Sequence, residues 1–383
     1  MQVYLDNAAT SRIKPSCVWQ AMENYYFHNN TNPGRSGYNL SLQAGKIVLD
    51  TREALAQFFN VPKATQVIFT QNITVALNIA IKGLLQPGDH VLISALEHNA
   101  IYRPIVALAE AGIITYDIIE LDETGALNLA ELEEKILPHT SMIAMTHASN
   151  LSGDILPLEQ VGKIAAAHQL YFIIDSAQTA GLIPLDMQKL GATALCFTGH
   201  KHLLGPVGTG GMCVEEAVLE KMNTLYEGGT GSISSSKLMP DFLPDKFESG
   251  TINALGLAGL GASVNYLLQQ DLASLRNHEL QLMQQLQAGL MEIPGFIMYG
   301  QADIHKRVGT LAFNFQDVDN SELCNILDED YGIMARPGLH CTPLAHQSYG
   351  SYPQGALRFS LGMHTTEAEI EYTISAIKSI LGN

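Results

Sequence analysis

Charged side chains are scarce in this sequence, and positively charged ones most of all. Only 15% of the 383 residues are charged, against a typical value of about 25%. The 21 basic residues are outnumbered by 38 acidic ones, which gives a net charge of −17 at pH 7. This balance argues against a nucleic-acid partner and against an anionic membrane surface. A long chain with few charges buries much of its surface in a large core, an oligomer interface, or both.

Long apolar runs and paired cysteines are also missing. No stretch approaches the roughly 20 apolar residues of a membrane span, and the segment after Met1 lacks the basic and apolar regions of a signal peptide. No CxxC or other paired spacing joins the five cysteines, Cys17, Cys196, Cys213, Cys324 and Cys341. Their odd number favours free thiols in a reducing compartment. We therefore expect a soluble cytoplasmic protein in which a cysteine can carry chemistry.

Short apolar runs alternate with helix-sized segments between about residues 65 and 215. Runs of this kind, bounded by polar residues, indicate buried strands of a largely parallel sheet in an α/β fold. A loop rich in Gly, Ser and Pro is expected over 228–250, and one strongly helical stretch over 258–291. Strands at Thr310–Phe315 and 357–360, with a helix at 367–381, then predict a smaller α+β domain.

Asp175 and Lys201 follow two neighbouring strands of this pattern. The run 171–174 ends at Asp175, and the run 194–197 leads into the segment that contains Lys201. Because chemistry in a doubly wound sheet lies at the carboxyl ends of the strands, both side chains should enter one crevice. A lysine that forms a Schiff base and a buried carboxylate that pairs with a pyridinium nitrogen are what pyridoxal phosphate (PLP) needs. The plainer alternatives are a loop lysine and a helix-capping aspartate.

Cys341 lies in a loop-like segment of Gly, Pro and polar residues. Arg336 and His340 lie near it in the sequence, and both can favour a thiolate. Cys196 and Cys213, in contrast, lie in apolar runs that suit structural cysteines. This contrast predicts that Cys341 is the reactive thiol, with a structural role as the alternative.

Arg358 stands in an apolar strand, where an arginine needs an anion. Its planar guanidinium suits a substrate carboxylate. His200 and His202 flank Lys201 but have no carboxylate or cysteine at metal-ligand spacing, and the histidines beside Cys341 lack a fourth partner. We therefore expect no metal.

Together these segments resemble the class V aminotransferase-like family of PLP enzymes, and within it the cysteine desulfurases and selenocysteine lyases. The matching motifs, in chain order, are YLDNAAT near the start, EHNA around His98, DSAQ at 175–178, TGHK at 198–201, FESGT at 247–251, RPGLHC at 336–341 and LRFSLG at 357–362. DSAQ and TGHK at this spacing are highly specific, and RPGLHC points to a desulfurase rather than a transaminase. The short interval from Cys341 to Arg358 resembles the group II branch, which usually depends on a separate sulfur acceptor, so the resemblance implies a sulfur-acceptor protein as a partner.

The resemblance implies a role for each matching residue. Implied cofactor-binding residues are Ile73, Thr74, His98, Asn150, Asp175, Gln178, Thr198, His200, Lys201 and Thr251; implied substrate-binding residues are Asn150, Arg336 and Arg358; implied catalytic residues are Lys201, Cys341 and His98. Among these, His98 is expected to stack on the ring and Gln178 to contact its phenolic oxygen. Ile73 replaces a threonine common in the family, so only its backbone N–H can serve. Thr251 is expected to reach the cofactor phosphate of a second subunit, which implies a homodimer.

The resemblance also implies PLP fold type I with a mainly parallel, seven-stranded type of sheet. A large PLP-binding domain is expected over 15–258, and a small domain over 1–14 and 259–383. The implied function is a PLP-dependent cysteine desulfurase that converts L-cysteine to L-alanine and leaves sulfur on Cys341 as a persulfide for an acceptor. The alternatives are a selenocysteine lyase acting on L-selenocysteine, a class V aminotransferase or epimerase, and a non-catalytic scaffold. The intact Lys201, Asp175 and Cys341 argue against the scaffold.

Overall fold

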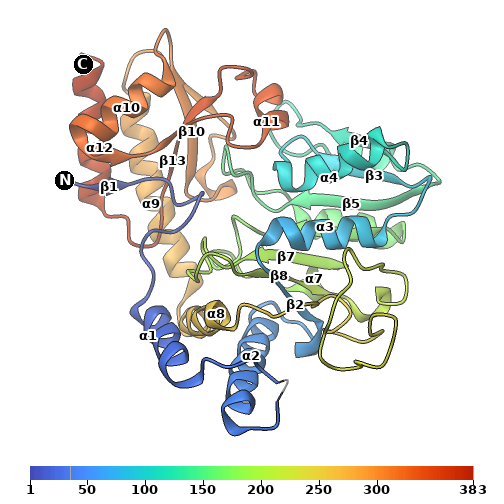
Figure 1. The fold of residues 1–383 in the computed structure, drawn as a ribbon. Helices are drawn as coiled ribbons and strands as arrows, with labels where there is room; N and C mark the ends of the chain where they lie inside the picture. The colour runs from blue at the N-terminus through green and yellow to red at the C-terminus, as the bar shows by residue number, and fades with distance from the viewer. Residues whose placement is uncertain (35, 383) are drawn as a thin grey trace.

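A large mixed sheet forms the centre of the computed structural model, which describes residues 1–34 and 36–382 (Figure 1). Its seven described strands are β2 (Val67–Thr70), β3 (His90–Ser94), β4 (Thr115–Ile119), β5 (Thr140–Thr146), β6 (Tyr171–Asp175), β7 (Ala194–Thr198) and β8 (Gly210–Val214). The strand order is β2-β8-β7-β6-β5-β3-β4, with every pair from β7 to β4 parallel and β8 antiparallel to both neighbours. The predicted α/β fold with a mainly parallel seven-stranded sheet is therefore confirmed.

The sheet is buried on both faces, which explains its continuous apolar strands. Successive residues of a strand point to opposite faces, so Val67 and Phe69 pack into one core while Ile68 packs into another. Residues of α2 (Asn39–Phe58), α6 (Leu158–Ala167) and α8 (Ala254–Leu268) belong to the first core, and residues of α3 (Ile73–Leu84) and α4 (Asn99–Glu110) belong to the second. Two helical layers thus enclose the sheet and leave its strand ends as the open edge.

A second, antiparallel sheet lies beside the first in the order β12-β13-β10-β9. Its strands are β9 (Phe296–Tyr299), β10 (Thr310–Phe315), β12 (Arg336–Gly338) and β13 (Ala356–Ser360). A third core joins it to α9 (Leu272–Met291), α10 (Asn320–Tyr331) and α12 (Glu367–Ile380). The N-terminal β1 (Val3–Tyr4) pairs in parallel with β11 (Ile333–Met334), so the first residues lie with the C-terminal part (Figure 1).

The remaining elements are short. They are α1 (Ser16–Asn24), α5 (Leu129–Glu134), α7 (Met187–Leu190), α11 (Pro343–Ser348), a π-helical turn at Tyr25–Asn29 and 3-10 turns at Ala64–Gln66, Glu216–Val218 and Ile304–Lys306. Residues 219–253, all of them described, contain no helix or strand, which confirms the predicted loop over 228–250. Within the described chain, no helix is long and apolar enough to cross a membrane.

One helix prediction needs correction, and one helix was not predicted. The expected single helix over 258–291 is two helices, because α8 ends at Leu268 and Asp271 caps α9 by accepting a hydrogen bond from Ala273 N at 3.1 Å. No helix was expected over the residues of α4, which contains Pro104 and so lacks one helical hydrogen bond. The division into domains stays a prediction, and its proposed boundary at 258/259 falls within α8.

Candidate active site

Asp175 and Lys201 come from neighbouring parallel strands, as the sequence predicted. Asp175 is the last residue of β6 and is paired in register with Cys196 of β7. Lys201 follows the end of β7 at Thr198. Because the two strands run in the same direction, their carboxyl ends place the carboxylate and the amine at one edge of the sheet.

The environment of Lys201 favours its neutral amine. Burial lowers the pKa of Lys201 to about 8, since removal from water penalises the ammonium form. The carboxylate of Asp175 opposes this shift, whereas Arg358 and Arg336 add to it. The amine is therefore available as a nucleophile or proton acceptor near neutral pH, which an ordinary lysine is not.

Asp175 is almost completely buried, and burial raises the pKa of its carboxyl group. A hydrogen bond from Ala177 N to Oδ1 at 2.8 Å and the charge of Lys201 oppose that rise. A buried carboxylate of this kind needs a further positively polarised partner. The ring N–H of a pyridinium group has the required chemistry.

Several buried polar atoms near these strand ends have no hydrogen-bond partner among the described residues. They are Asn150 Oδ1, Gln178 Oε1, Thr198 Oγ1 and His200 Nδ1. Gln178 is held from its other side, because its Nε2 donates to Ala8 O at 3.1 Å. Buried polar groups are rarely left unpaired, so a ligand with several polar groups fits this edge. The residues predicted for PLP match this requirement.

The first turn of α3 offers backbone N–H groups to an anion. Asn72 caps the helix by accepting from Val75 N at 3.1 Å, and α3 begins at Ile73. The N–H groups of Ile73 and Thr74 lie where a helix has no internal acceptors, so they suit a phosphate. Ile73 thus retains a use despite its apolar side chain.

His98 caps α4, because its Nδ1 accepts a hydrogen bond from Ala100 N at 3.0 Å. Burial, followed by the charge of Lys201, lowers the pKa of His98 to about 4. The ring is therefore neutral at physiological pH, with Nδ1 as the acceptor. A neutral, fixed imidazole ring is suited to stacking on a flat cofactor.

Cys341 is exposed at the tip of a loop that is hydrogen-bonded to the segments after β3 and β5. Its carbonyl oxygen accepts from Asn99 N at 2.8 Å, and the preceding carbonyl of His340 accepts from Asn150 Nδ2 at 2.8 Å. His340 and Cys341 have φ values of 50° and 59°, in the left-handed region that such residues rarely adopt. The hydrogen bonds hold this strained turn, and so they fix where the thiol lies.

The other cysteines differ from Cys341 as predicted. Cys196 and Cys213 are buried within β7 and β8, and burial raises the pKa of both thiols. Cys324 is also buried, and burial raises its pKa to about 11. These three thiols are structural, whereas Cys341 is open to reactants.

Arg358 has an anionic partner within the chain itself. It is 1% exposed, and its Nη2 lies 2.5 Å from Asp6 Oδ1 while its Nη1 donates to Asn150 O at 3.0 Å. Its Nε is buried and has no partner among the described residues. The anion that the sequence required is therefore at least partly Asp6, a residue to which sequence reasoning gave no role. Arg336 lies directly opposite Arg358 in the β12–β13 pair.

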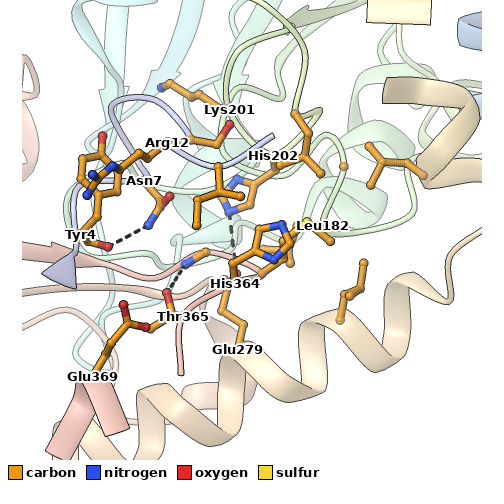
Figure 2. A pocket seen from close by; sticks show the side chains of 18 residues that line it. Tyr4, Asn7, Arg12, Leu182, Lys201, His202, Glu279, His364, Thr365 and Glu369 are labelled. Atoms are coloured by element: carbon orange, nitrogen blue, oxygen red, sulfur yellow. Dashed lines mark hydrogen bonds and ion pairs between the residues drawn. The ribbon is translucent and has the colours of Figure 1, made fainter. Parts of the chain in front are cut away.

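A second residue that the sequence did not predict, Glu279, lines a pocket together with Lys201 and His202 (Figure 2). Glu279 of α9 is nearly fully buried, and its Oε1 accepts from Gly309 N at 2.7 Å. Its Oε2 lies 3.8 Å from His202 Nε2 (Figure 2). Burial raises the pKa of Glu279 to about 7 and lowers that of His202 to about 4. Glu279 thus links a helix of the C-terminal part to the residue after Lys201.

Gly181 allows the backbone near Lys201 to pack closely. Its φ is +99°, and a Cβ at this position would lie 2.1 Å from the carbonyl oxygen of His202. We expect Gly181→Ala to lower the free energy of unfolding by about 2 kcal/mol or more, from both the backbone conformation and the clash. Urea unfolding of both proteins measures this change. Gly37→Ala is the control, because nothing lies within 4 Å of its Cβ position; equal losses for both variants would contradict the argument.

The fold and the site define an α/β enzyme whose reactive groups gather at the carboxyl edge of a mainly parallel sheet. The chain belongs to the aminotransferase class-V family, whose model matches residues 3–373. It is 32% identical to a probable cysteine desulfurase of Methanothermobacter thermautotrophicus, over 99% of this chain and 95% of that protein. It is 31% identical to a cysteine desulfurase of Pectobacterium atrosepticum, over 98% of this chain and 92% of that protein.

Solved structures agree with these sequence relationships. The apo structure of a cysteine desulfurase from Thermococcus onnurineus matches 100% of this chain and 95% of its own, with a TM-score of 0.92 and 30% identity. A cysteine desulfurase of Escherichia coli in its S-sulfonic acid form matches the same shares, with a TM-score of 0.89 and 27% identity. The resemblance seen in the sequence motifs is therefore confirmed at the level of the family.

Proposed function

We propose that this protein is a PLP-dependent cysteine desulfurase that converts L-cysteine to L-alanine and retains the sulfur on Cys341. The observation that carries the proposal is the placement of Cys341. Its exposed thiol lines one cavity with His98 and Thr74, at the edge of the sheet where Lys201 and Asp175 lie. The names of the relatives support the same reaction.

The chain's own residues account for binding the cofactor. PLP, when bound, supplies an electron sink for negative charge at the substrate Cα. Lys201 would hold its aldehyde carbon and Asp175 its ring nitrogen, while His98 would lie against the ring and Gln178 would contact the phenolic oxygen. Its phosphate would be held by the first-turn N–H groups and side chains of α3 and the β7 end, namely Ile73, Thr74, Thr198 and His200.

Lys201 and Cys341 carry the proton and sulfur transfers. Lys201 Nζ takes the Cα proton, which the neutral amine does well because its pKa is near the working pH. The Cys341 Sγ forms a bond to the substrate sulfur as the substrate Cβ–S bond breaks. The net change is L-cysteine plus the Cys341 thiol giving L-alanine plus the Cys341 persulfide. In this proposal, Asn150, Arg336 and Arg358 bind the amino-acid substrate, and Arg358 Nε, which has no partner among the described residues, is available for it.

A homodimer is part of this proposal. Thr251 is exposed and lines a surface pocket with Phe69 and Thr70, so a second subunit can approach it. Exposed aromatic side chains such as Trp19 and Phe27 lie near α1 and the following turn, which is typical of an interaction surface. The compact Cys341 loop further supports transfer of the sulfur to a separate acceptor.

The test is a single turnover with L-cysteine and no thiol acceptor. We expect one equivalent of L-alanine per site and a mass gain of one sulfur atom on the Cys341 peptide. Cys341→Ala should lose the persulfide and form alanine from L-cysteine about 100-fold more slowly or worse. Cys17→Ala, a change at a half-buried thiol, serves as the control.

The same variants separate the neighbouring functions. If Cys341→Ala forms alanine from L-cysteine at the wild-type rate, the nucleophile assignment is wrong. If L-selenocysteine is turned over much faster than L-cysteine and does not need Cys341, the protein is instead a selenocysteine lyase.

A further inference from the structure

A groove of about 360 Å³ extends from Cys341 along the boundary between α3 and α4. Its described lining residues are Thr74, Asn78, Lys82, His98, Asn99, Ala100, Arg103, Pro104, Ala107 and Cys341. Ala100 and Pro104 are buried, so they form its floor, whereas Lys82 and Arg103 are exposed. The inner end of the groove belongs to the site already described, but most of its length does not.

The spacing of the lining residues gives the groove its direction. Thr74, Asn78 and Lys82 recur every four residues and therefore lie along one face of α3. At 1.5 Å per residue, Lys82 lies about 12 Å along the helix from Thr74. Cys341 is fixed at the opposite end, because its carbonyl oxygen accepts from Asn99 N at the start of α4. The groove thus runs from the thiol outward, past Arg103 and Lys82.

The groove is positively charged in a strongly acidic protein. Two basic side chains line it, and no carboxylate does among the residues that the structure describes. Across the described part of the chain, neither Lys82 nor Arg103 forms an ion pair. The whole chain carries −17, so its overall field repels anions. Lys82 and Arg103, neither in an ion pair within the described chain, give the surface beside the exposed thiol a local positive charge. At this place the protein therefore attracts anions instead of repelling them.

We propose that this groove binds a small anionic thiol, carrying one or two carboxylates, that takes the sulfur from Cys341. The inference rests on the proposed function, since it requires a persulfide there. The volume lies within the roughly 300–1,000 Å³ of small-molecule sites.

The transfer needs no further oxidant or reductant. The thiolate of the acceptor attacks the terminal sulfur of the Cys341 persulfide and forms a new S–S bond. The bond between the two sulfur atoms on Cys341 breaks, and its electron pair returns to Sγ as a thiolate. The products are the acceptor persulfide and free Cys341. Lys82 and Arg103 bind the carboxylates of the acceptor and so hold its thiol toward Cys341.

A first experiment tests whether the electrostatic field in the groove attracts anions, and it needs no catalytic turnover. The rates of Cys341 alkylation by iodoacetate and by iodoacetamide are measured by peptide mass, and their ratio is compared between variants. For Lys82→Glu/Arg103→Glu we expect the iodoacetate-to-iodoacetamide ratio to fall about fivefold to tenfold at low ionic strength, and less at about 0.5 M salt. Lys163→Glu/Lys189→Glu makes the same change in net charge on α6 and α7, and should leave the ratio within about twofold.

A second experiment tests the acceptor itself. Protein carrying the Cys341 persulfide is mixed with mercaptosuccinate, 2-mercaptoethanol or cysteamine, and loss of the persulfide is followed by mass. We expect mercaptosuccinate to act fastest, with saturation, and to lose that advantage in Lys82→Glu/Arg103→Glu but not in the control pair. Equal rate constants for the three thiolates, or an advantage that survives the charge reversal, would overturn the proposal. If no persulfide forms with L-cysteine, the proposed function fails, and the persulfide is then made chemically to test the groove.

Discussion

Replacing Lys201 with alanine is expected to lower alanine formation from L-cysteine by about 1,000-fold or more. The variant loses both the amine that holds the cofactor and the base that takes the Cα proton, and a positioned base alone contributes about 10²–10⁴-fold. Alanine is measured in single turnovers, with the fold checked by thermal unfolding. A variant that keeps a tenth of the wild-type rate would remove Lys201 from the mechanism.

The pH dependence of Lys201 gives a readout that does not depend on turnover. Its pKa is lowered to about 8, so the reactive neutral amine should increase as the pH rises toward 8 and level off above it. Trace acetylation of the protein without cofactor, mapped by mass, measures this fraction. Lys189, whose pKa is raised by Glu159, is the internal control and should still be gaining reactivity above pH 10. Identical profiles for the two lysines would show that burial does not tune Lys201.

Replacing Arg307 with methionine is expected to cost about 3–5 kcal/mol of unfolding free energy. Arg307 is fully buried and donates to Ser152 O at 2.9 and 2.6 Å and to Thr310 O at 2.8 Å. Its Nε also lies 3.9 Å from Asp154 Oδ1. Removing the guanidinium leaves buried carbonyl oxygens without a hydrogen-bond donor and leaves Asp154 without its countercharge. The expected cost is large for both reasons. Urea unfolding monitored by circular dichroism measures it.

Two further variants test the cause of that loss. Arg12→Met removes an exposed guanidinium that lies over the ring of Tyr4 and should change stability by less than about 1 kcal/mol. Arg307→Met/Asp154→Leu removes both charges and should recover part of the loss, because no buried charge is then unpaired. Asp154→Leu is also measured alone. A double variant that loses the full sum of the Arg307→Met and Asp154→Leu losses would mean that the ion pair is not the reason.

The parts of the site that follow from local patterns were accessible from the sequence. Asp175 and Lys201 follow short apolar runs that end in polar residues. Neighbouring parallel strands bring such ends together at one edge of the sheet. Cys341 was separable from Cys196 and Cys213 because its neighbours are polar and theirs are apolar. These inferences needed only neighbouring residues and the geometry of one sheet.

The missed parts depend on contacts between distant segments. Asp6 pairs with Arg358 from the opposite end of the chain, and no local feature marks it as the anion that this arginine needs. Glu279 lies in a helix with no unusual sequence feature, and its contacts come from distant residues, Gly309 just before β10 and His202 next to Lys201. The break between α8 and α9 was not predicted, because the Leu-rich and Gln-rich segments on either side of it both favour helix. The signal is Asp271, which caps α9.

The turn at His340 and Cys341 restricts how sulfur can leave the protein. The loop begins at β12 in the antiparallel sheet, yet hydrogen bonds from Asn99 and Asn150 attach it to the segments that follow β3 and β5 of the parallel sheet. These bonds hold the backbone carbonyls of His340 and Cys341, so the position of the Cys341 backbone is set. The Cys341 loop therefore does not carry the sulfur to the acceptor. Each acceptor must instead bring its own sulfur atom to within bonding distance of Cys341.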